Sequence, residues 1–180
     1  MKAAAFLDRD GVLNASIMLE GVPCPPRSIT DVEILPGVRS AVKLLIHNGY
    51  LPIVITNQPD IARGSKSISE IKQINEHIGT EVGLSNFYIC PHDDEDGCNC
   101  RKPKPGLIQL AEKELGIDLS KSFLVGDRWR DIQAGQAVKL PSFFIDYSYP
   151  ESQPKQPFTR VKSLLEAVYI RLGVSNGFNN

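Results

Sequence analysis

The sequence predicts an α/β fold built on one Rossmann-like, doubly wound parallel sheet. Short apolar segments alternate along the 180 residues with longer segments of helical periodicity, which is the pattern of β-α-β units. Polar residues directly follow three of the apolar segments, where open α/β sheets place their ligands. The length suits one domain, which we expect over residues 1–172, with a disordered tail over residues 173–180.

Five short apolar runs are the expected strands, and polar or glycine-containing turns separate them from their neighbours. They cover residues 3–7, 51–55, 87–89, 122–125 and 143–145. The connection after the first run contains Pro23, Pro25 and Pro26. Because proline cannot donate a backbone hydrogen bond and disrupts helix interiors, this connection is not expected to form a regular helix.

Five segments with helical periodicity are the expected helices. They cover residues 38–48, 67–82, 105–115, 131–138 and 160–172. Ser67 and Glu70 have the spacing of a capping box at the start of the second segment. Pro105 occupies the first turn of the third segment and Gly116 ends it. The last segment carries an apolar stripe that begins at Val161 and predicts packing against the sheet.

Composition and charge narrow the class of protein. The chain has 20 Lys and Arg against 21 Asp and Glu, for a formal net charge of −1, so neither a nucleic-acid nor a membrane-surface partner is expected. No apolar run approaches the ~20 residues of a membrane span, and charged residues interrupt the N-terminus before a signal peptide could form. We therefore expect a cytoplasmic monomer, in which cysteines serve as thiols or metal ligands rather than disulfides.

The polar residues at the strand ends predict a phosphoryl-transfer site. Asp8 and Asp10 follow the first expected strand, Thr56 ends the second, and Asp127 follows the fourth. Three carboxylates gathered at one sheet edge favour Mg²⁺, whose ligands in proteins are hard oxygens. Lys102 would add a positive charge and Thr56 a hydroxyl donor, and a carboxylate could serve as the nucleophile. The alternative for Asp8 and Asp10 is an ordinary polar turn.

A second metal site is expected in the cysteine-rich segment, residues 90–100. Cys90, His92, Cys98 and Cys100 together offer three thiolates and one imidazole, which is a closed tetrahedral donor set for a structural Zn²⁺. Residues 93–97, which separate His92 from Cys98, are four acidic residues and a glycine and cannot form a core. The alternative is a group of reduced thiols beside a solvated acidic turn.

The order of these motifs resembles that of the haloacid dehalogenase superfamily of phosphatases over roughly residues 2–145. The matching segments are Asp8-Arg9-Asp10-Gly11, Thr56, Lys102-Pro103-Lys104-Pro105-Gly106, and Gly126-Asp127 with Asp131. The resemblance implies that Asp8 is the nucleophile, Asp10 the acid/base, and Thr56 and Lys102 the phosphoryl ligands. It also implies that Asp8, Asp127 and the carbonyl of Asp10 bind Mg²⁺. Asp131 is expected to orient Lys102 or metal-bound water, or else to be only a helix-start charge.

The cysteine-rich segment is similar to that of the capless branch that contains heptose 1,7-bisphosphate 7-phosphatases and histidinol-phosphate phosphatases. Asn14 and residues 56–58, 61–64 and 100–103 resemble the heptose enzymes. This resemblance implies hydrolysis of the 7-phosphate of D-glycero-D-manno-heptose 1,7-bisphosphate in activated-heptose or lipopolysaccharide precursor synthesis. Histidinol phosphate is the rival substrate, and a zinc-stabilised binding module without catalysis is the alternative from another class. The residues expected to bind substrate are Asn57, Arg63, Arg101 and Arg128.

The chain departs from the heptose enzymes in ways that bear on substrate identity. Pro59-Asp60 stands where those enzymes have Ser-Gly, and Arg128 replaces a lysine beside the expected metal ligand Asp127. The residues after Asn14 lack the polar sugar-contacting segment. No long insertion follows Asn14 or Gly106, so no cap domain is expected. The sequence leaves the anomer of the substrate open.

Overall fold

The computed structural model describes residues 1–174 and contains one six-stranded parallel sheet. Its strand order is β5-β4-β1-β6-β7-β8, which places the first strand in the middle. The strands are β1 (Ala3–Leu7), β4 (Tyr50–Asn57), β5 (Phe87–Cys90), β6 (Phe123–Gly126), β7 (Ser142–Ile145) and β8 (Thr159–Val161). The predicted doubly wound α/β fold is therefore confirmed. The tail expected over residues 173–180 lies outside the described residues from residue 175 onward.

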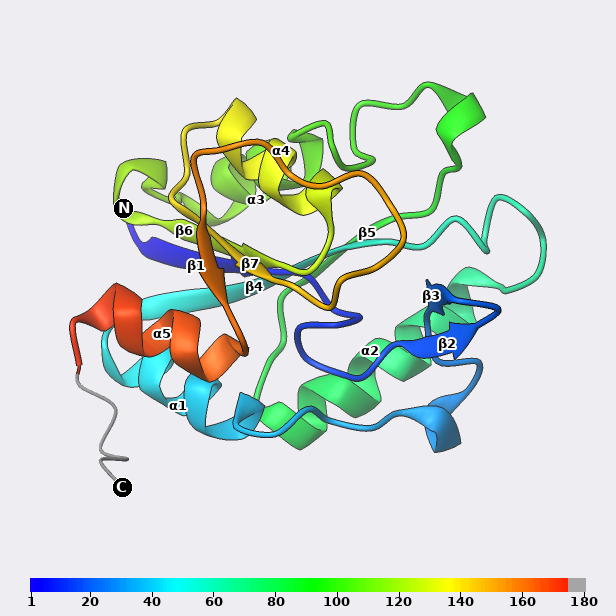
Figure 1. Cartoon of the computed structure of the whole chain (residues 1–180), viewed down its shortest axis with the longest axis horizontal. Coiled ribbons are helices and arrows are strands. Elements are labelled where there is room, and N and C mark those ends of the chain that lie inside the picture. Colours follow the sequence, from blue (N-terminus) through cyan, green and yellow to red (C-terminus); the bar gives the residue numbers. More distant parts are fainter. Residues whose placement is uncertain (175–180) are drawn as a thin grey trace.

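Helices cover both faces of the sheet. In Figure 1, α1, α2 and α5 lie on one side of the strands and α3 and α4 on the other. Their bounds are α1 (Val38–His47), α2 (Ile68–Val82), α3 (Gly106–Leu115), α4 (Trp129–Ala137) and α5 (Leu164–Leu172). No helix within residues 1–174 is long and apolar enough to cross a membrane.

Strand β1 shows why the sheet is buried on both faces. Ala5 and Leu7 pack into the core beneath α1, α2 and α5, while Ala4 and Phe6 pack into the core beneath α3 and α4. All four side chains have 0% exposure. Alternate residues of a strand point to opposite faces, so a strand covered on both faces is a continuous apolar run. The run then ends at Asp8, at the carboxyl edge of the sheet.

The helix expected over residues 160–172 begins later than predicted, at Leu164. Residues Thr159–Val161 instead form β8, which pairs in parallel with β7 through Phe143↔Thr159 and Ile145↔Val161. Val161 is buried in the same core that the helix covers. Its apolar character therefore fits either element locally, and the pairing with β7 decides in favour of a strand.

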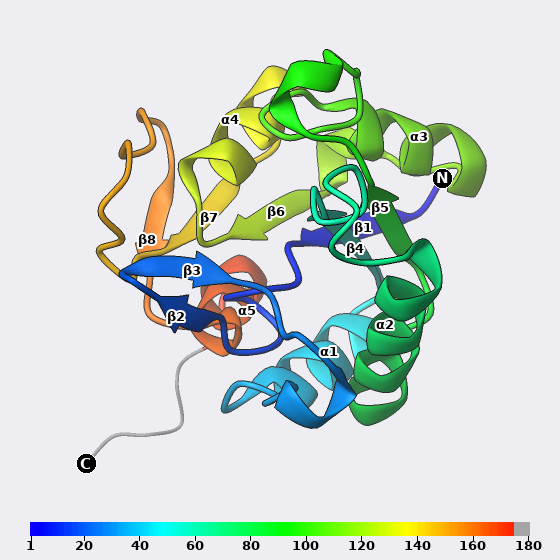
Figure 2. The ribbon, with the colours of Figure 1, turned by 90° about the vertical axis from the view of Figure 1, so that its right-hand side faces the viewer.

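The proline-rich connection after β1 contains a hairpin that the sequence interpretation missed. Strands β2 (Ile17–Leu19) and β3 (Val22–Cys24) pair antiparallel around the two-residue turn Glu20-Gly21. Both turn residues have positive φ, 50° and 81°, as a hairpin turn of this length requires. Figure 2 faces the edge toward which the central strands run and shows the hairpin beside it. Between β1 and α1, the structure contains this hairpin and one 3₁₀ turn, Ile29–Asp31.

Candidate functional site

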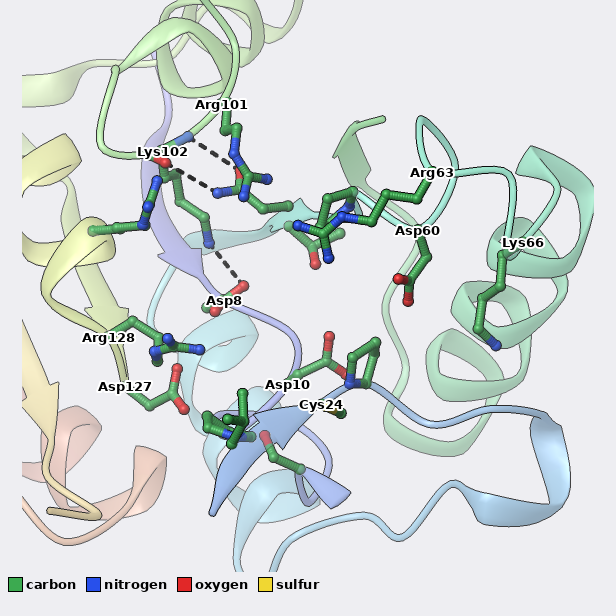
Figure 3. A pocket seen from close by; sticks show the side chains of 18 of the residues that line it. Asp8, Asp10, Cys24, Asp60, Arg63, Lys66, Arg101, Lys102, Asp127 and Arg128 are labelled. Atoms are coloured by element: carbon green, nitrogen blue, oxygen red, sulfur yellow. Dashed lines mark hydrogen bonds and ion pairs between the residues drawn. The ribbon is translucent and has the colours of Figure 1, made fainter. Parts of the chain in front are cut away.

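The carboxyl ends of β1, β4 and β6 meet around a cavity of about 790 Å³. Because β1 lies between β4 and β6, the residues that follow or end these strands become neighbours. Figure 3 shows Asp8, Lys102 and Asp127 at one end of the cavity and Arg63 and Lys66 toward the other. The charged residues that line it are Asp8, Asp10, Arg27, Asp60, Arg63, Lys66, Glu70, Arg101, Lys102, Asp127, Arg128, Arg130 and Asp131.

Lys102 is the buried cation at the centre of this site. Its Nζ lies 2.8 Å from Asp8 Oδ1 and 2.6 Å from Asp131 Oδ1, and it donates to the Ile55 carbonyl at 2.8 Å. An ammonium group has three N–H donors, so all three are used. Burial opposes the charge of Lys102, but the two carboxylates outweigh it and raise the pKa of the ammonium group. The lysine therefore stays charged beside Asp8.

Asp8, Asp127 and Asp131 form a carboxylate cluster whose oxygens lie within 4.8 Å of one another. Burial, together with the Asp131 carboxylate, raises the pKa of Asp8 to about 7, and burial raises the pKa of Asp127 well above its ordinary value. Asp127 Oδ1 is buried and has no hydrogen-bond partner within residues 1–174. A hard divalent cation would relieve both the repulsion and the unpaired oxygen, so this donor set fits Mg²⁺.

Gly11 allows the loop after β1 to pass close to this cluster. Its φ is +83°, and a Cβ placed there would lie 2.0 Å from Asp127 Oδ2. Any other residue would therefore displace the Asp127 carboxylate as well as strain the backbone. The Tyr147 hydroxyl donates to the Gly11 carbonyl at 3.0 Å and ties the segment after β7 to the same loop.

The Asp10 carboxylate is held in place by four N–H donors from three residues, contacts that the sequence did not predict. Arg9 Nε and Nη2 donate to its two oxygens at 3.1 and 2.9 Å, and Asn14 Nδ2 donates at 3.0 Å. Gln58 Nε2 donates to both Asp10 Oδ2 at 3.0 Å and Thr56 Oγ1 at 2.8 Å. Arg9, Asn14 and Gln58 have 0% exposure, although they are polar. Such burial places them in the supporting structure of the site.

Asp131 contacts Lys102 and also caps a helix, so it is more than a helix-start charge. Its Oδ1 contacts Lys102, and its Oδ2 accepts a hydrogen bond from the Arg128 backbone N–H at 2.9 Å, which caps the start of α4. Asn57 acts on Lys102 from the other side, through two 3.1 Å hydrogen bonds between its side-chain amide and the Lys102 backbone. Asn57 therefore positions the lysine-bearing loop as well as lining the cavity.

Cys90, His92, Cys98 and Cys100 form a second cluster, on the loop after β5. The Sγ atom of Cys100 lies 3.2 Å from that of Cys90 and 3.4 Å from that of Cys98, and His92 Nδ1 lies 3.3 Å from Cys100 Sγ. A tetrahedral zinc site with bonds of ~2.3 Å requires sulfur atoms about 3.8 Å apart, close to this arrangement. All four cysteines of the chain are free, and the cluster is compatible with a zinc site.

The arginines expected to bind substrate line the cavity, and each is paired with a carboxylate. Arg63 contacts Asp93 through two bonds, one of them 3.0 Å long. Arg101 Nε donates to Asp94 at 2.8 Å. Arg128 forms a two-pronged ion pair with Glu151, which lies in the segment between β7 and β8. The structure thus brings the predicted residues together and adds acidic partners that fix their orientation.

Comparisons with known proteins agree with this geometry. A family model described as haloacid dehalogenase-like hydrolase matches residues 26–139. A D-glycero-beta-D-manno-heptose-1,7-bisphosphate 7-phosphatase of Pasteurella multocida is 39% identical over 78% of this chain and 79% of its own. A D-glycero-alpha-D-manno-heptose-1,7-bisphosphate 7-phosphatase of Photorhabdus laumondii is 33% identical over 84% and 87%.

Among solved structures, the crystal structure of D,D-heptose 1,7-bisphosphate phosphatase from B. bronchiseptica, complexed with magnesium and phosphate, superposes with a TM-score of 0.83. It covers 96% of this chain and 99% of its own at 24% identity, and this likeness supports the fold. The family model and the sequence relatives support more than the fold, because the match extends over most of the chain. The chain belongs to the haloacid dehalogenase-like hydrolase family.

Proposed function

We propose that this protein is a Mg²⁺-dependent phosphomonoesterase that hydrolyses the 7-phosphate of D-glycero-D-manno-heptose 1,7-bisphosphate in the cytoplasm. The observation that carries the reaction type is the contact of 2.8 Å between Lys102 Nζ and Asp8 Oδ1, beside the Asp127 carboxylate. The substrate is supported by relatives that act on heptose 1,7-bisphosphate and by a cavity rich in arginine. The same relatives favour this substrate over histidinol phosphate.

Asp8 is proposed as the nucleophile. Its Oδ1 is bound by Lys102 Nζ and by the Arg9 backbone N–H at 2.8 Å, whereas its Oδ2 accepts no hydrogen bond within residues 1–174. Asp8, Asp127 and the Asp10 carbonyl would hold Mg²⁺, which when bound neutralises charge on the phosphoryl oxygens. The charges of Lys102 and of bound Mg²⁺ would both favour the ionised form of Asp8 in the presence of the dianionic substrate.

The first step transfers the phosphoryl group to Asp8. A carboxylate oxygen of Asp8 forms a bond to phosphorus while the bond from phosphorus to the C7 oxygen breaks, and protonated Asp10 donates its proton to that oxygen. Thr56 Oγ1 accepts a hydrogen bond from Gln58, so its own O–H is oriented away from Gln58 and is available to a phosphoryl oxygen. The products of this step are the heptose 1-phosphate and an aspartyl-phosphate.

The second step hydrolyses the aspartyl-phosphate. Asp10, now a carboxylate, takes a proton from a water molecule whose oxygen attacks phosphorus, and the bond to Asp8 breaks to release inorganic phosphate. Arg9, Asn14 and Gln58 hold the Asp10 carboxylate in one place through both steps. A fixed position matters because proton transfer depends on a separation close to hydrogen-bond length.

Zn²⁺ is proposed as a structural ion held by Cys90, His92, Cys98 and Cys100. The purified protein is expected to contain about one zinc per chain, measured by inductively coupled plasma mass spectrometry. Cys98→Ser is expected to lose the zinc and to lower the Tm, because metal binding contributes to folding. Cys24→Ser is the control, since Cys24 lies outside the cluster. A Cys98→Ser protein that keeps its zinc, or a wild-type protein that holds none, would contradict the assignment.

Steady-state kinetics test the proposed substrate. The kcat/KM for both anomers of heptose 1,7-bisphosphate is expected to exceed that for histidinol phosphate by about 100-fold or more, because the arginine-rich wall favours an anion over an ammonium group. A preference for histidinol phosphate would replace the proposed substrate and leave the phosphatase chemistry intact. Absence of turnover on both, with the other sugar phosphates also inert, would instead favour the non-catalytic module.

A further inference from the structure

Three arginines from separate parts of the chain meet the acidic turn of the cysteine-rich segment. Arg63 follows β4, Arg101 precedes the buried lysine, and Arg130 lies in the first turn of α4. Their partners are Asp93 and Asp94, which directly follow the cluster histidine. Figure 3 shows Arg101 and Arg63 along the same side of the cavity. The acidic turn therefore gathers guanidinium groups onto one wall of the cavity that contains the nucleophile.

Asp94 joins two of these arginines directly. Arg101 Nε donates to its Oδ1 at 2.8 Å, and Arg130 Nη1 and Nη2 donate to Oδ1 and Oδ2 at 2.7 and 3.2 Å. Arg101 is fixed further by Nη1, which donates to the His92 carbonyl at 3.1 Å. Arg130 lies over the Trp129 ring, with its guanidinium carbon 5.0 Å from the ring centre. Each guanidinium is thus held by two independent contacts.

The arrangement keeps donors available for a ligand. A guanidinium has five N–H donors. Within residues 1–174, Arg130 directs its two Nη atoms at Asp94 and its Nε at no protein acceptor, whereas all three nitrogens of Arg101 face acceptors, with Nη2 3.8 Å from Asp93. Two guanidinium charges share one Asp94 carboxylate, so the pair keeps a net positive charge. Both arginines line the cavity, whereas Asp94 does not. Arg128 differs in its charge balance, because its guanidinium is paired one-to-one with the Glu151 carboxylate through Nε and Nη2.

We propose that Arg130, held beside Arg101 by Asp94, is a further ligand of the second phosphate group of a sugar bisphosphate. This assignment rests on the proposed function and extends it, because it adds Arg130 as a substrate-binding residue and Asp94 as a positioning residue. Planar guanidinium groups bind phosphate oxygens in pairs, and two of them fixed at one carboxylate present a prepared surface to a dianion. The cysteine cluster then contributes to specificity by fixing the turn that carries Asp94.

The test compares two substrates that differ only in the second phosphate, heptose 1,7-bisphosphate and heptose 7-phosphate. Arg130→Ala is expected to lower the ratio of their kcat/KM values by about tenfold or more, because charge-assisted hydrogen bonds to the 1-phosphate are lost. Arg160→Ala is the matched control, since Arg160 pairs with Asp146 and does not line the cavity. A ratio that stays within twofold of wild type in Arg130→Ala overturns the proposal.

Asp94→Asn tests the positioning role. It is expected to raise KM for the bisphosphate several-fold with little change in kcat, while zinc content stays at the wild-type level, and Asp94→Glu is expected to recover most of the loss. Exposed ion pairs contribute little to stability, so a selective effect on KM reports on the subsite rather than on folding. Equal losses with both substrates, or loss of zinc, would show that Asp94 is merely structural.

Binding of heptose 1-phosphate separates this proposal from the proposed function. The compound carries only the second phosphate, so its Kd, measured by isothermal titration calorimetry, does not depend on turnover. We expect a Kd about tenfold higher in Arg130→Ala than in wild type. Equal Kd values would overturn the subsite even if the bisphosphate is hydrolysed. Failure of wild type to hydrolyse the bisphosphate would contradict the proposed function while a weaker Kd in the variant still supported the subsite.

Discussion

Asp8→Asn is expected to lower kcat by about 10⁴-fold or more, because an amide cannot attack phosphorus and no other carboxylate can replace a positioned nucleophile. The variant should still fold, since the amide oxygen can accept the hydrogen bonds that Lys102 Nζ and the Arg9 backbone N–H now give to Asp8 Oδ1. Single-turnover assays with acid quench and intact-mass spectrometry provide the measurement. Wild type should show a phosphorylated chain, and the variant should not.

Asp60→Asn is the control for this experiment. Asp60 lines the same cavity but is not part of the carboxylate cluster, so its replacement removes an equal charge without touching the proposed nucleophile. We expect kcat in Asp60→Asn to stay within about threefold of wild type, as for a half-buried group that contacts no reacting atom. An Asp8→Asn protein that is still phosphorylated would place the nucleophile at another residue.

Lys102→Met should have the largest effect on stability. The substitution removes the buried cation that contacts Asp8 and Asp131 and leaves these carboxylates beside Asp127. Removing one partner of a buried ion pair costs about 3–5 kcal/mol, because the remaining charge is buried without compensation. For a chain of this size that corresponds to a decrease in Tm of about 10 °C. Turnover should also fall strongly, since Asp8 loses the charge that keeps it ionised.

Magnesium and a surface lysine provide the controls for Lys102→Met. Millimolar Mg²⁺ is expected to restore part of the lost Tm, because it would neutralise the same cluster from another direction. Lys121→Met removes a lysine that is 69% exposed and paired with Asp118 at 3.2 Å, and it should change stability by less than about 1 kcal/mol. Equal Tm values for Lys102→Met and Lys121→Met would show that the cluster does not depend on Lys102.

Local sequence pattern predicted the site residues that lie at the ends of strands. The apolar run 3–7 indicates a buried strand, and a parallel sheet brings its end next to Thr56 and Asp127. The same reasoning found most helices to within a few residues, including the capping box at Ser67, because caps and periodicity act over a few neighbouring positions. It was wrong at Val161, where it predicted a helix, because pairing with β7 makes this residue part of a strand.

Local sequence pattern did not predict the burial and the contacts of the long polar side chains in the site. Arg9 follows the nucleophile and would ordinarily be assigned to the surface, yet it has 0% exposure and donates to Asp10 and, through Nη1, to Asn75 on α2. Gln58 had no assigned role beyond its place in the segment 56–58, but its side chain links Asp10 to Thr56. Sequence periodicity does not indicate these contacts, because they form only when separate elements pack together.

Local sequence pattern was sufficient to predict that strands and helices alternate and that Asp8, Asp10, Thr56 and Asp127 stand at strand ends. It also showed that three cysteines and a histidine are spaced as a metal-binding set. These are statements about which elements form, and short-range sterics and apolar periodicity control them. The bridge from Arg101 through Asp94 to Arg130 is evident only in the packed fold, because flexible charged side chains pair with the groups that the fold places within reach.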